Sequence, residues 1–273
     1  MQTNEQLLLA IENYLAQTEF PAEPGLLYAP IGYSLAGGGK RLRPMLLMLS
    51  NGIFTDKIQH ALPAAAAVEV FHNFTLLHDD IMDNAAVRRG KPSVYAKWGQ
   101  NVAILSGDAM LICAYRLLGE VPAQLLPQIL STFNTMALEV CEGQQYDMDF
   151  ERKPKVSVVE YMHMIELKTS VLLAGATTIG ALLGGAFVTS NRESGDGRYD
   201  IQLKPTKKEL PGILIELKAE KNCSDEKLKK LSETALQQIN DKKYETELTT
   251  AGVRTIYKYG VAFSGKKVEV AVG

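Results

Sequence analysis

The sequence pattern changes near residue 187, and the two parts of the chain require different folds. Residues 1–186 consist of long runs rich in Ala, Leu, Met, Glu and Gln, broken by Pro and Gly, which is typical of helices. After residue 190 come short runs such as GRYDIQL, GILIELKA and KKVEVAV, which predict strands around one long charged helix. We therefore expect an all-α domain over residues 1–186 and a small α/β domain, ordered β-β-α-β-β, over residues 187–273.

The distribution of charge supports this division. Residues 1–186 hold 13 Lys and Arg against 18 Asp and Glu, whereas residues 187–273 hold 16 against 13. Neither imbalance is large enough to require a nucleic-acid or membrane partner. The three cysteines, Cys113, Cys141 and Cys223, are far apart and odd in number, which favours reduced thiols in a cytoplasmic protein.

An uncharged stretch of 23 residues lies between Lys168 and Arg192. It is long enough to cross a bilayer and contains a Gly180-xxx-Gly184 pair. The same composition suits a central helix that is surrounded by other helices. Because the stretch is rich in Gly and Thr and lacks an aromatic belt or a basic flank, we expect a buried helix and no stable membrane span.

The most informative motif is HDDIMDNAAVRRG. On a helix Asp79 and Asp83 share a face, and Asp80 lies about 100° to one side of Asp79. Carboxylates at this spacing repel one another unless a cation is present, and oxygen ligands favour Mg²⁺ shared with substrate phosphates. Arg88 and Arg89 add bidentate donors, so the motif predicts a diphosphate site. A solvated acidic helix face is the alternative, but the apolar VEVFHNFTLL before it indicates a packed helix.

A second basic motif, GGGKRLRP, lies upstream. Its glycines allow the backbone to approach an anion closely, and Lys40, Arg41 and Arg43 supply positive charge. A basic surface loop is the simpler alternative. Further along, ELKTSVLLAG places Lys168 and Thr169 in a helical context.

Together these motifs resemble the trans-isoprenyl diphosphate synthase (polyprenyl synthetase) family over about residues 1–186. The resemblance implies an isoprenoid-synthase-type helical bundle and a prenyltransferase of isoprenoid biosynthesis, with Mg²⁺ as cofactor and allylic and isopentenyl diphosphates as substrates. In such an enzyme, cations stabilise the departing diphosphate, and the double bond of isopentenyl diphosphate attacks the allylic cation. The resemblance assigns metal binding and catalysis to Asp79, Asp80 and Asp83. It assigns allylic diphosphate binding to Arg88, supported by Lys168 as a further catalytic residue, and a place near the carbocation to Thr169. The residues that it assigns to isopentenyl diphosphate are Lys40, Arg43, His72 and Arg89.

Phe74 suggests a limit on product length. It precedes Asp79 by five residues and therefore lies about 7 Å further down the helix. A phenyl ring there would close the hydrocarbon tunnel early, which predicts a product of farnesyl or geranylgeranyl size.

The sequence departs from this family in one respect. The family has a second Asp-rich motif after the Lys-Thr pair, but Asp79-Asp80 is the only Asp-Asp pair in the 273 residues. We therefore expect an incomplete bundle whose condensation activity is absent or weak, although diphosphate binding could survive. Apolar faces left by the missing helices predict self-association, most simply as a homo-oligomer.

A second set of charged residues follows the change of pattern. On a strand, Glu216 and Lys218 point to one face, and a hairpin would bring Asp200 next to them. Two carboxylates can hold a divalent metal, and an adjacent ammonium can help a metal-bound water attack a phosphodiester. The alternative is an ordinary ion pair on a lysine-rich surface.

This second set resembles the PD-(D/E)xK nuclease superfamily over about residues 187–273. The resemblance implies metal binding by Asp200 and Glu216, catalysis by Lys218 and nucleic acid as a partner. Glu193, Gln238 and Tyr244 also match its motif positions. The chain therefore combines parts of two enzyme families without a polar linker, as a fusion would. Three functions follow in order of preference: an impaired prenyltransferase, a metal-dependent nuclease, and a non-catalytic fusion.

Overall fold

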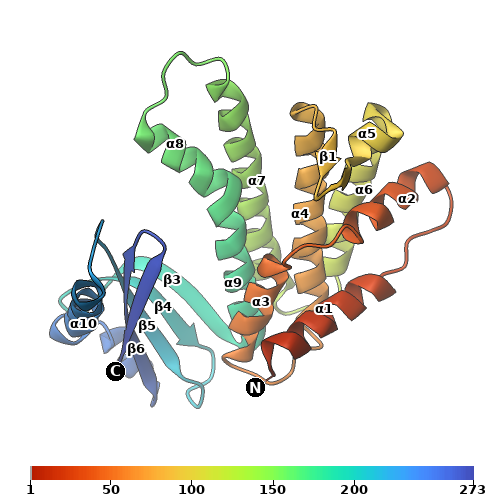
Figure 1. Cartoon of the computed structure of the whole chain (residues 1–273). Helices are drawn as coiled ribbons and strands as arrows, with labels where there is room; N and C mark the ends of the chain where they lie inside the picture. The colour runs from red at the N-terminus through yellow and green to blue at the C-terminus, as the bar shows by residue number, and fades with distance from the viewer. Residues whose placement is uncertain (1) are drawn as a thin grey trace. The chain divides into compact units, whose positions relative to one another are not determined.

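The computed structural model describes residues 2–273 and divides into two compact units, Met1–Leu183 and Gly184–Gly273 (Figure 1). The first unit is mainly helical, and the second is built on a β-sheet. The predicted combination of a helical domain with a small α/β domain is confirmed.

The helical unit consists of long helices joined by short turns. Its helices are α1 (Asn4–Gln17), α2 (Gly25–Leu35), α3 (Leu42–Gly52), α4 (Leu62–Met82), α5 (Val94–Trp98), α6 (Gln100–Leu118), α7 (Leu126–Phe150), α8 (Val158–Ile165), the π-helical segment η1 (Glu166–Ser170) and α9 (Val171–Gly184).

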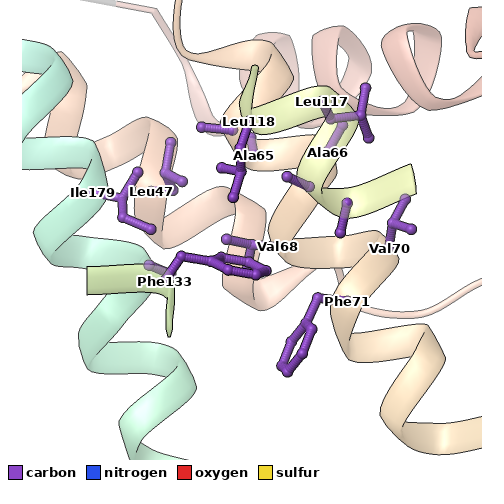
Figure 2. Packing of buried hydrophobic residues seen from close by; sticks show 14 of the residues in the cluster. Leu47, Ala65, Ala66, Val68, Val70, Phe71, Leu117, Leu118, Phe133 and Ile179 are labelled. Carbon is purple, nitrogen blue, oxygen red and sulfur yellow. The ribbon is translucent and has the colours of Figure 1, made fainter. Parts of the chain in front are cut away.

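Helix α4 lies at the centre of this unit. Every residue from Leu62 to Phe71 is buried, because neighbouring helices surround the first half of α4 on all sides. A run of four alanines in this stretch lets those neighbours approach closely. Phe71 packs against Phe133 of α7, with the ring centroids 5.2 Å apart. Figure 2 labels both residues in this core. This packing fixes the second half of α4, which carries the Asp-rich motif.

The uncharged stretch after Lys168 forms α9. Leu172 and Ile179 are buried in the main core, and a Cβ added at Gly180 would lie 2.1 Å from the carbonyl oxygen of Leu47. Gly180 therefore permits a backbone contact between α9 and α3. The helix ends at Gly184, so the last residues of the predicted buried helix belong to a strand instead.

Within residues 2–273, two helical stretches are long and apolar enough to cross a membrane by length and composition. They are Gln100–Leu118 and Val158–Gly184, with mean hydropathies of 1.3 and 1.4. Helices in the core of a folded domain pass the same test, and the second stretch is 56% buried. The absence of a stable membrane span stays a prediction.

A small hairpin interrupts the part that was expected to be entirely helical. Strands β1 (Val87–Arg88) and β2 (Lys91–Pro92) pair in antiparallel fashion across a turn in which Arg89 and Gly90 have φ values of 52° and 76°. Both central residues of a type I′ hairpin turn have positive φ. The expectation of no strands here was wrong, because a two-residue strand is too short to show any periodicity.

The sheet unit contains five strands in the order β3-β4-β5-β6-β7. Only β5 and β6 are parallel; the other neighbours are antiparallel. The elements are β3 (Ala186–Ser194), β4 (Gly197–Pro205), β5 (Gly212–Ala219), α10 (Asp225–Asp241), α11 (Thr246–Thr250), β6 (Ile256–Ser264) and β7 (Lys267–Val272). The predicted order β-β-α-β-β was wrong, because it lacks strand β3. The sequence of β3, AFVTSNRES, has an apolar start and a polar end without the alternation of a typical strand, so its pattern did not predict a strand.

Helix α10 packs against one face of this sheet. A Cβ added at Gly260 of β6 would lie 2.2 Å from the carbonyl oxygen of Ser232 in α10, so the helix and the strand touch through their backbones. Leu214 of β5 and Ile239 of α10 are buried in the core between them. This contact places the polar residues of α10 beside the charged residues of β5.

Candidate functional site

A cavity of about 280 Å³ lies between the second half of α4, α7 and η1. Phe74, Asp79, Lys168 and Thr169, which the sequence analysis had selected, all line it. Half of the remaining lining residues are apolar, including Val140, Met148 and Leu172. The cavity therefore has a carboxylate and an ammonium together with a hydrocarbon wall.

A second cavity, of about 470 Å³, collects basic side chains from three separate elements. Lys40 lies just before α3 and Arg43 in its first turn, while His72 comes from α4 and Arg89 from the β1–β2 hairpin. These are the four residues that the resemblance assigned to isopentenyl diphosphate. Arg43 and His72 line both cavities, so the two spaces adjoin.

The β1–β2 hairpin directs its two arginines to different places. Arg88 donates from Nε and Nη2 to Oδ1 of Asp80, at 2.8 and 2.5 Å, and from Nη2 to Asp79 at 3.2 Å. Arg89, in the turn, donates instead to the carbonyl oxygen of Gly38. Consecutive arginines thus serve the Asp-rich motif and the basic cavity respectively.

Basic groups of the protein neutralise the carboxylates of the first cavity. The Nζ of Lys168 lies 3.2 Å from Asp79 and 2.6 Å from Asp147 of α7. Burial opposes the charge of Lys168, but its hydrogen bonds to Asp147 and Asp79 outweigh this effect and raise its pKa. Burial, together with the charges of Asp79 and Asp147, raises the pKa of Asp83. The site therefore resists any further negative charge and favours cations.

Asp147 is a carboxylate of the site that sequence reasoning did not assign. It lies one turn after Gly143, where an added Cβ would meet the backbone nitrogen of Lys168 at 2.3 Å. Gly143 lets η1 approach α7 closely enough for Lys168 to reach Asp147. The motif EGQQYDMDF contains both residues and was the available signal.

His72 is neutral at physiological pH. Burial, followed by the nearby charges of Arg43 and Arg89, lowers its pKa from 6.5 to about 3. Its Nε2 lies 3.2 Å from Nη1 of Arg43, which can only donate, so Nε2 is the acceptor. The imidazole thereby holds the guanidinium of Arg43 at the junction of the two cavities.

The three aspartates do not form a preformed metal cage. Asp80 is buried and turned toward Arg88, and no group of three His, Cys, Asp or Glu side chains within residues 2–273 could hold a metal ion. Asp79 and Asp83 nevertheless offer oxygen donors beside one another, and this chemistry suits Mg²⁺. The metal-binding role of Asp79, Asp80 and Asp83 stays a prediction.

The sheet unit brings its selected residues together at one place. The backbone N–H of Leu217 donates to Asp200 at 2.7 Å, which puts Asp200 beside Glu216. Lys218 lies 3.5 Å from Glu216 and donates to Gln238 of α10 at 2.6 Å. Gln238 in turn donates to both Glu216 and, at 3.1 Å, to Tyr244.

Glu216 is a buried member of this group, and one of its carboxylate oxygens lacks a partner among the described residues. It is 4% exposed, and its Oε2 has no hydrogen-bond partner among residues 2–273. Burial and the charge of Asp200 raise the pKa of Glu216. Glu193 lies instead at the exposed end of β3, opposite Arg198, and no contact joins it to the group in the described part of the chain.

Comparison with known proteins identifies the helical unit. The Polyprenyl synthetase family model matches residues 24–196. The chain belongs to the polyprenyl synthetase family. Residues 172–272 also match the model of the PD-(D/E)XK nuclease superfamily, and the two matches overlap in α9 and β3.

Two similar relatives are archaeal geranylgeranyl diphosphate synthases. The chain is 48% identical over 166 residues to a geranylgeranyl diphosphate synthase of Methanosarcina mazei, covering 60% of this chain and 51% of the relative. It is 40% identical over 164 residues to that of Sulfolobus acidocaldarius, covering 59% and 50%. A solved geranylgeranyl pyrophosphate synthase superposes with a TM-score of 0.66 and 50% identity, over 67% of this chain and 56% of that one. The chain thus spans about half the length of the relatives it matches.

Proposed function

We propose that the helical unit binds an allylic diphosphate and isopentenyl diphosphate in its two cavities and supports Mg²⁺-dependent prenyl transfer between them. The observation that carries this proposal is the shared wall formed by Arg43 and His72. Two substrates must meet for carbon–carbon bond formation. The cavity beside Asp79, with its apolar wall, and the adjoining basic cavity would bring them together. The names of the similar relatives agree with an isoprenyl diphosphate substrate.

In this proposal the basic residues bind and orient the two diphosphates. Lys40, Arg43 and Arg89 hold isopentenyl diphosphate, while Arg88 and Lys168 turn from the aspartates toward the allylic diphosphate. Mg²⁺, when bound by Asp79, Asp80 and Asp83, would neutralise the departing diphosphate. Thr169 and Phe74 line the space left for the hydrocarbon and exclude water from it.

We further propose that prenyl transfer is impaired. Asp147 lies on the far side of the Lys168 ammonium from Asp79, and both carboxylates pair with that ammonium. No second Asp-Asp pair exists in the sequence to complete the metal site. We therefore expect the chain to bind both diphosphates but to condense them slowly or not at all.

The test is calorimetric titration with a non-reactive allylic diphosphate analogue, with and without Mg²⁺. We expect Mg²⁺-linked binding that Asp79→Ala weakens at least about 100-fold, because the carboxylate is removed from the metal site. Glu12→Ala, on the exposed face of α1, is the matched control and should bind as the unmodified chain does. Absence of Mg²⁺-linked binding in the unmodified chain would contradict the proposal, and rapid condensation would contradict the impairment alone.

A second candidate function belongs to the sheet unit. The unpartnered Oε2 of buried Glu216, close to Asp200 and Lys218, favours a divalent metal and phosphodiester cleavage. Incubation with DNA and with RNA in Mg²⁺ or Mn²⁺ tests this function, and Lys218→Ala should abolish any cleavage. No response in either unit would leave a non-catalytic fusion.

Two further expectations complete the proposal. Self-association as a homo-oligomer is tested by light scattering, and a clean monomer would contradict it. A cytoplasmic location follows from the unpaired cysteines and is tested by cell fractionation.

A further inference from the structure

A buried ion pair, Arg41 with Glu69, lies in the wall of the basic cavity, and the proposed binding of the two diphosphates does not by itself explain it. Arg41 is 8% exposed and Glu69 is 2% exposed. The Nη1 of Arg41 lies 2.5 Å from Oε1 of Glu69, and its Nη2 donates to the carbonyl oxygen of Leu35 at 2.7 Å. Asn73, one turn after Glu69 in α4, donates to the same Oε1 at 3.1 Å. The pair therefore joins α2, the start of α3 and α4.

The backbone of Arg41 adopts an unusual conformation that directs its side chain into this pair. Arg41 precedes α3 with φ 46° and ψ 33°, in the left-handed region that residues with a Cβ rarely adopt. This conformation sends the side chain of Arg41 toward Glu69, while Lys40 and Arg43 on either side line the basic cavity with it. The contacts of Arg41 thus decide how its two neighbours face the cavity.

Electrostatics alone would not place Glu69 here. It is the single carboxylate among the residues that line this cavity in the described part of the chain. A negative charge beside a diphosphate pocket should weaken anion binding. Its presence is explained if the carboxylate is needed to hold Arg41, whose charge it cancels.

We propose that the Glu69–Arg41 pair is a positioning element that aligns Lys40 and Arg43 for the diphosphate of isopentenyl diphosphate. Neither residue of the pair is the principal ligand. Glu69 fixes Arg41, and the left-handed turn at Arg41 fixes the two cations. This inference rests on the proposed function of the basic cavity, whose ligand is isopentenyl diphosphate.

The decisive variant is Glu69→Gln, which keeps the shape of the side chain and removes its charge. If only electrostatics mattered, losing a negative charge would tighten binding. Positioning predicts the opposite: calorimetry with isopentenyl diphosphate should show about tenfold weaker binding, as expected when one charge-assisted hydrogen bond is lost. The matched control is Glu12→Gln on the exposed face of α1, which should leave the affinity unchanged.

A second ligand separates positioning from a general loss of structure. Neither Arg41 nor Glu69 lines the cavity beside Asp79, so Mg²⁺-linked binding of an allylic diphosphate analogue should change less than about twofold. If both ligands weaken equally, the pair is merely structural and the inference is overturned. Arg41→Lys provides a milder perturbation: it keeps the charge but cannot donate to Glu69 and Leu35 in the same planar arrangement, and it should reproduce the selective loss.

A double variant tests whether the two residues act through one another. Arg41→Gln and Glu69→Gln together should bind isopentenyl diphosphate no more weakly than Arg41→Gln alone, because each change already breaks the same pair. Additive losses, or unchanged or tighter binding in Glu69→Gln, would overturn the inference while leaving the proposed function intact. If the unmodified chain does not bind isopentenyl diphosphate, the proposed function fails and the inference fails with it.

Discussion

The two units both place carboxylates beside basic side chains, but they balance these charges differently. In the helical unit Lys168 bridges Asp79 and Asp147, and Arg88 covers Asp80. In the sheet unit Glu216 is buried with one oxygen unpartnered among the described residues. Ion-paired carboxylates stabilise the ligand-free protein, and a ligand must break these pairs in order to bind. A buried carboxylate oxygen without a partner lowers the stability of the fold until a cation binds to it.

The units also assemble their sites from different kinds of contact. The sheet site comes from neighbouring strands and from α10, which packs on the same sheet. The helical site joins α4, α7, η1 and a hairpin, which only tertiary packing brings together. A substitution that weakens the core of the helical unit should therefore displace more residues of the helical site than the replacement of any single charged residue in that site.

The largest expected effect concerns the independence of the two cores. Phe133→Ala removes a fully buried ring that packs between Phe71 and Tyr115, and it should lower the stability of the helical unit by about 4 kcal/mol. Ile239→Ala is the counterpart in α10 and should cost the sheet unit about 3 kcal/mol. Calorimetric unfolding measures both changes. If either substitution shifts both transitions equally, the units are one cooperative body and the comparison fails.

The next effect depends on pH and should appear in the helical unit. His72 has a pKa of about 3 in the folded state against 6.5 for a free side chain. Between these values the unfolded chain binds a proton that the folded chain does not, so stability is full above pH 6.5 and falls as the pH is lowered. The slope can reach about 1.4 kcal/mol per pH unit.

Denaturant unfolding at pH 7, 6 and 5 checks this slope. His72→Asn should flatten the pH dependence because the titrating group is gone. His163→Asn, on the exposed surface of α8, is the control and should retain the slope of the unmodified chain. An unchanged slope in His72→Asn would show that His72 is not kept neutral by the cavity.

Local sequence patterns alone predicted which charged residues lie together in the sheet unit, whereas in the helical unit they did so only in part. Strand alternation placed Glu216 and Lys218 on one face, and the structure shows them in contact while Leu217 between them is 39% exposed. The pairing of β4 with β5 brought Asp200 alongside. These are short-range consequences of a period of two residues, so sequence alone can reveal them.

The helical site required more than periodicity. Helical spacing put Asp79 and Asp83 on one face, but grouping Lys40, His72 and Arg89 depended on the family resemblance. The motif EGQQYDMDF marks Gly143 and Asp147, but neither it nor any other local pattern predicts that η1 packs against Gly143 or that Arg41 pairs with Glu69, because each contact depends on which elements pack together. The β1–β2 hairpin and β3 were missed for the opposite reason: their local patterns are too short or too mixed.

Opposite changes in stability should distinguish the two charge arrangements. Lys168→Met removes the ammonium between Asp79 and Asp147 and should lower stability by about 1.5 kcal/mol, because the carboxylates then repel. Glu216→Gln removes a buried charge with an unpartnered oxygen and should raise stability by about 1 kcal/mol. Both are measured by denaturant unfolding at pH 7 without divalent metal. Changes of the same sign would remove the contrast between the units.

The smallest expected effect concerns the apolar wall, which distinguishes the helical cavity from the polar group in the sheet unit. The ring of Phe74 lines the cavity and packs 5.5 Å from Phe71 and 4.7 Å from His78, between centroids. Phe74→Ala should open space for a longer hydrocarbon, so the affinity for geranylgeranyl diphosphate relative to farnesyl diphosphate should rise by about threefold, or less than 1 kcal/mol.

Competitive binding of the two diphosphates in Mg²⁺ measures this ratio without requiring turnover. Tyr146→Ala, on α7 but outside the residues that line the cavity, is the aromatic control and should leave the ratio unchanged. If Phe74→Ala weakens both ligands equally, the ring supports the wall without limiting its depth. A selective gain for the longer chain would instead show that the helical cavity measures hydrocarbon length at Phe74, since the diphosphate end of both ligands is the same.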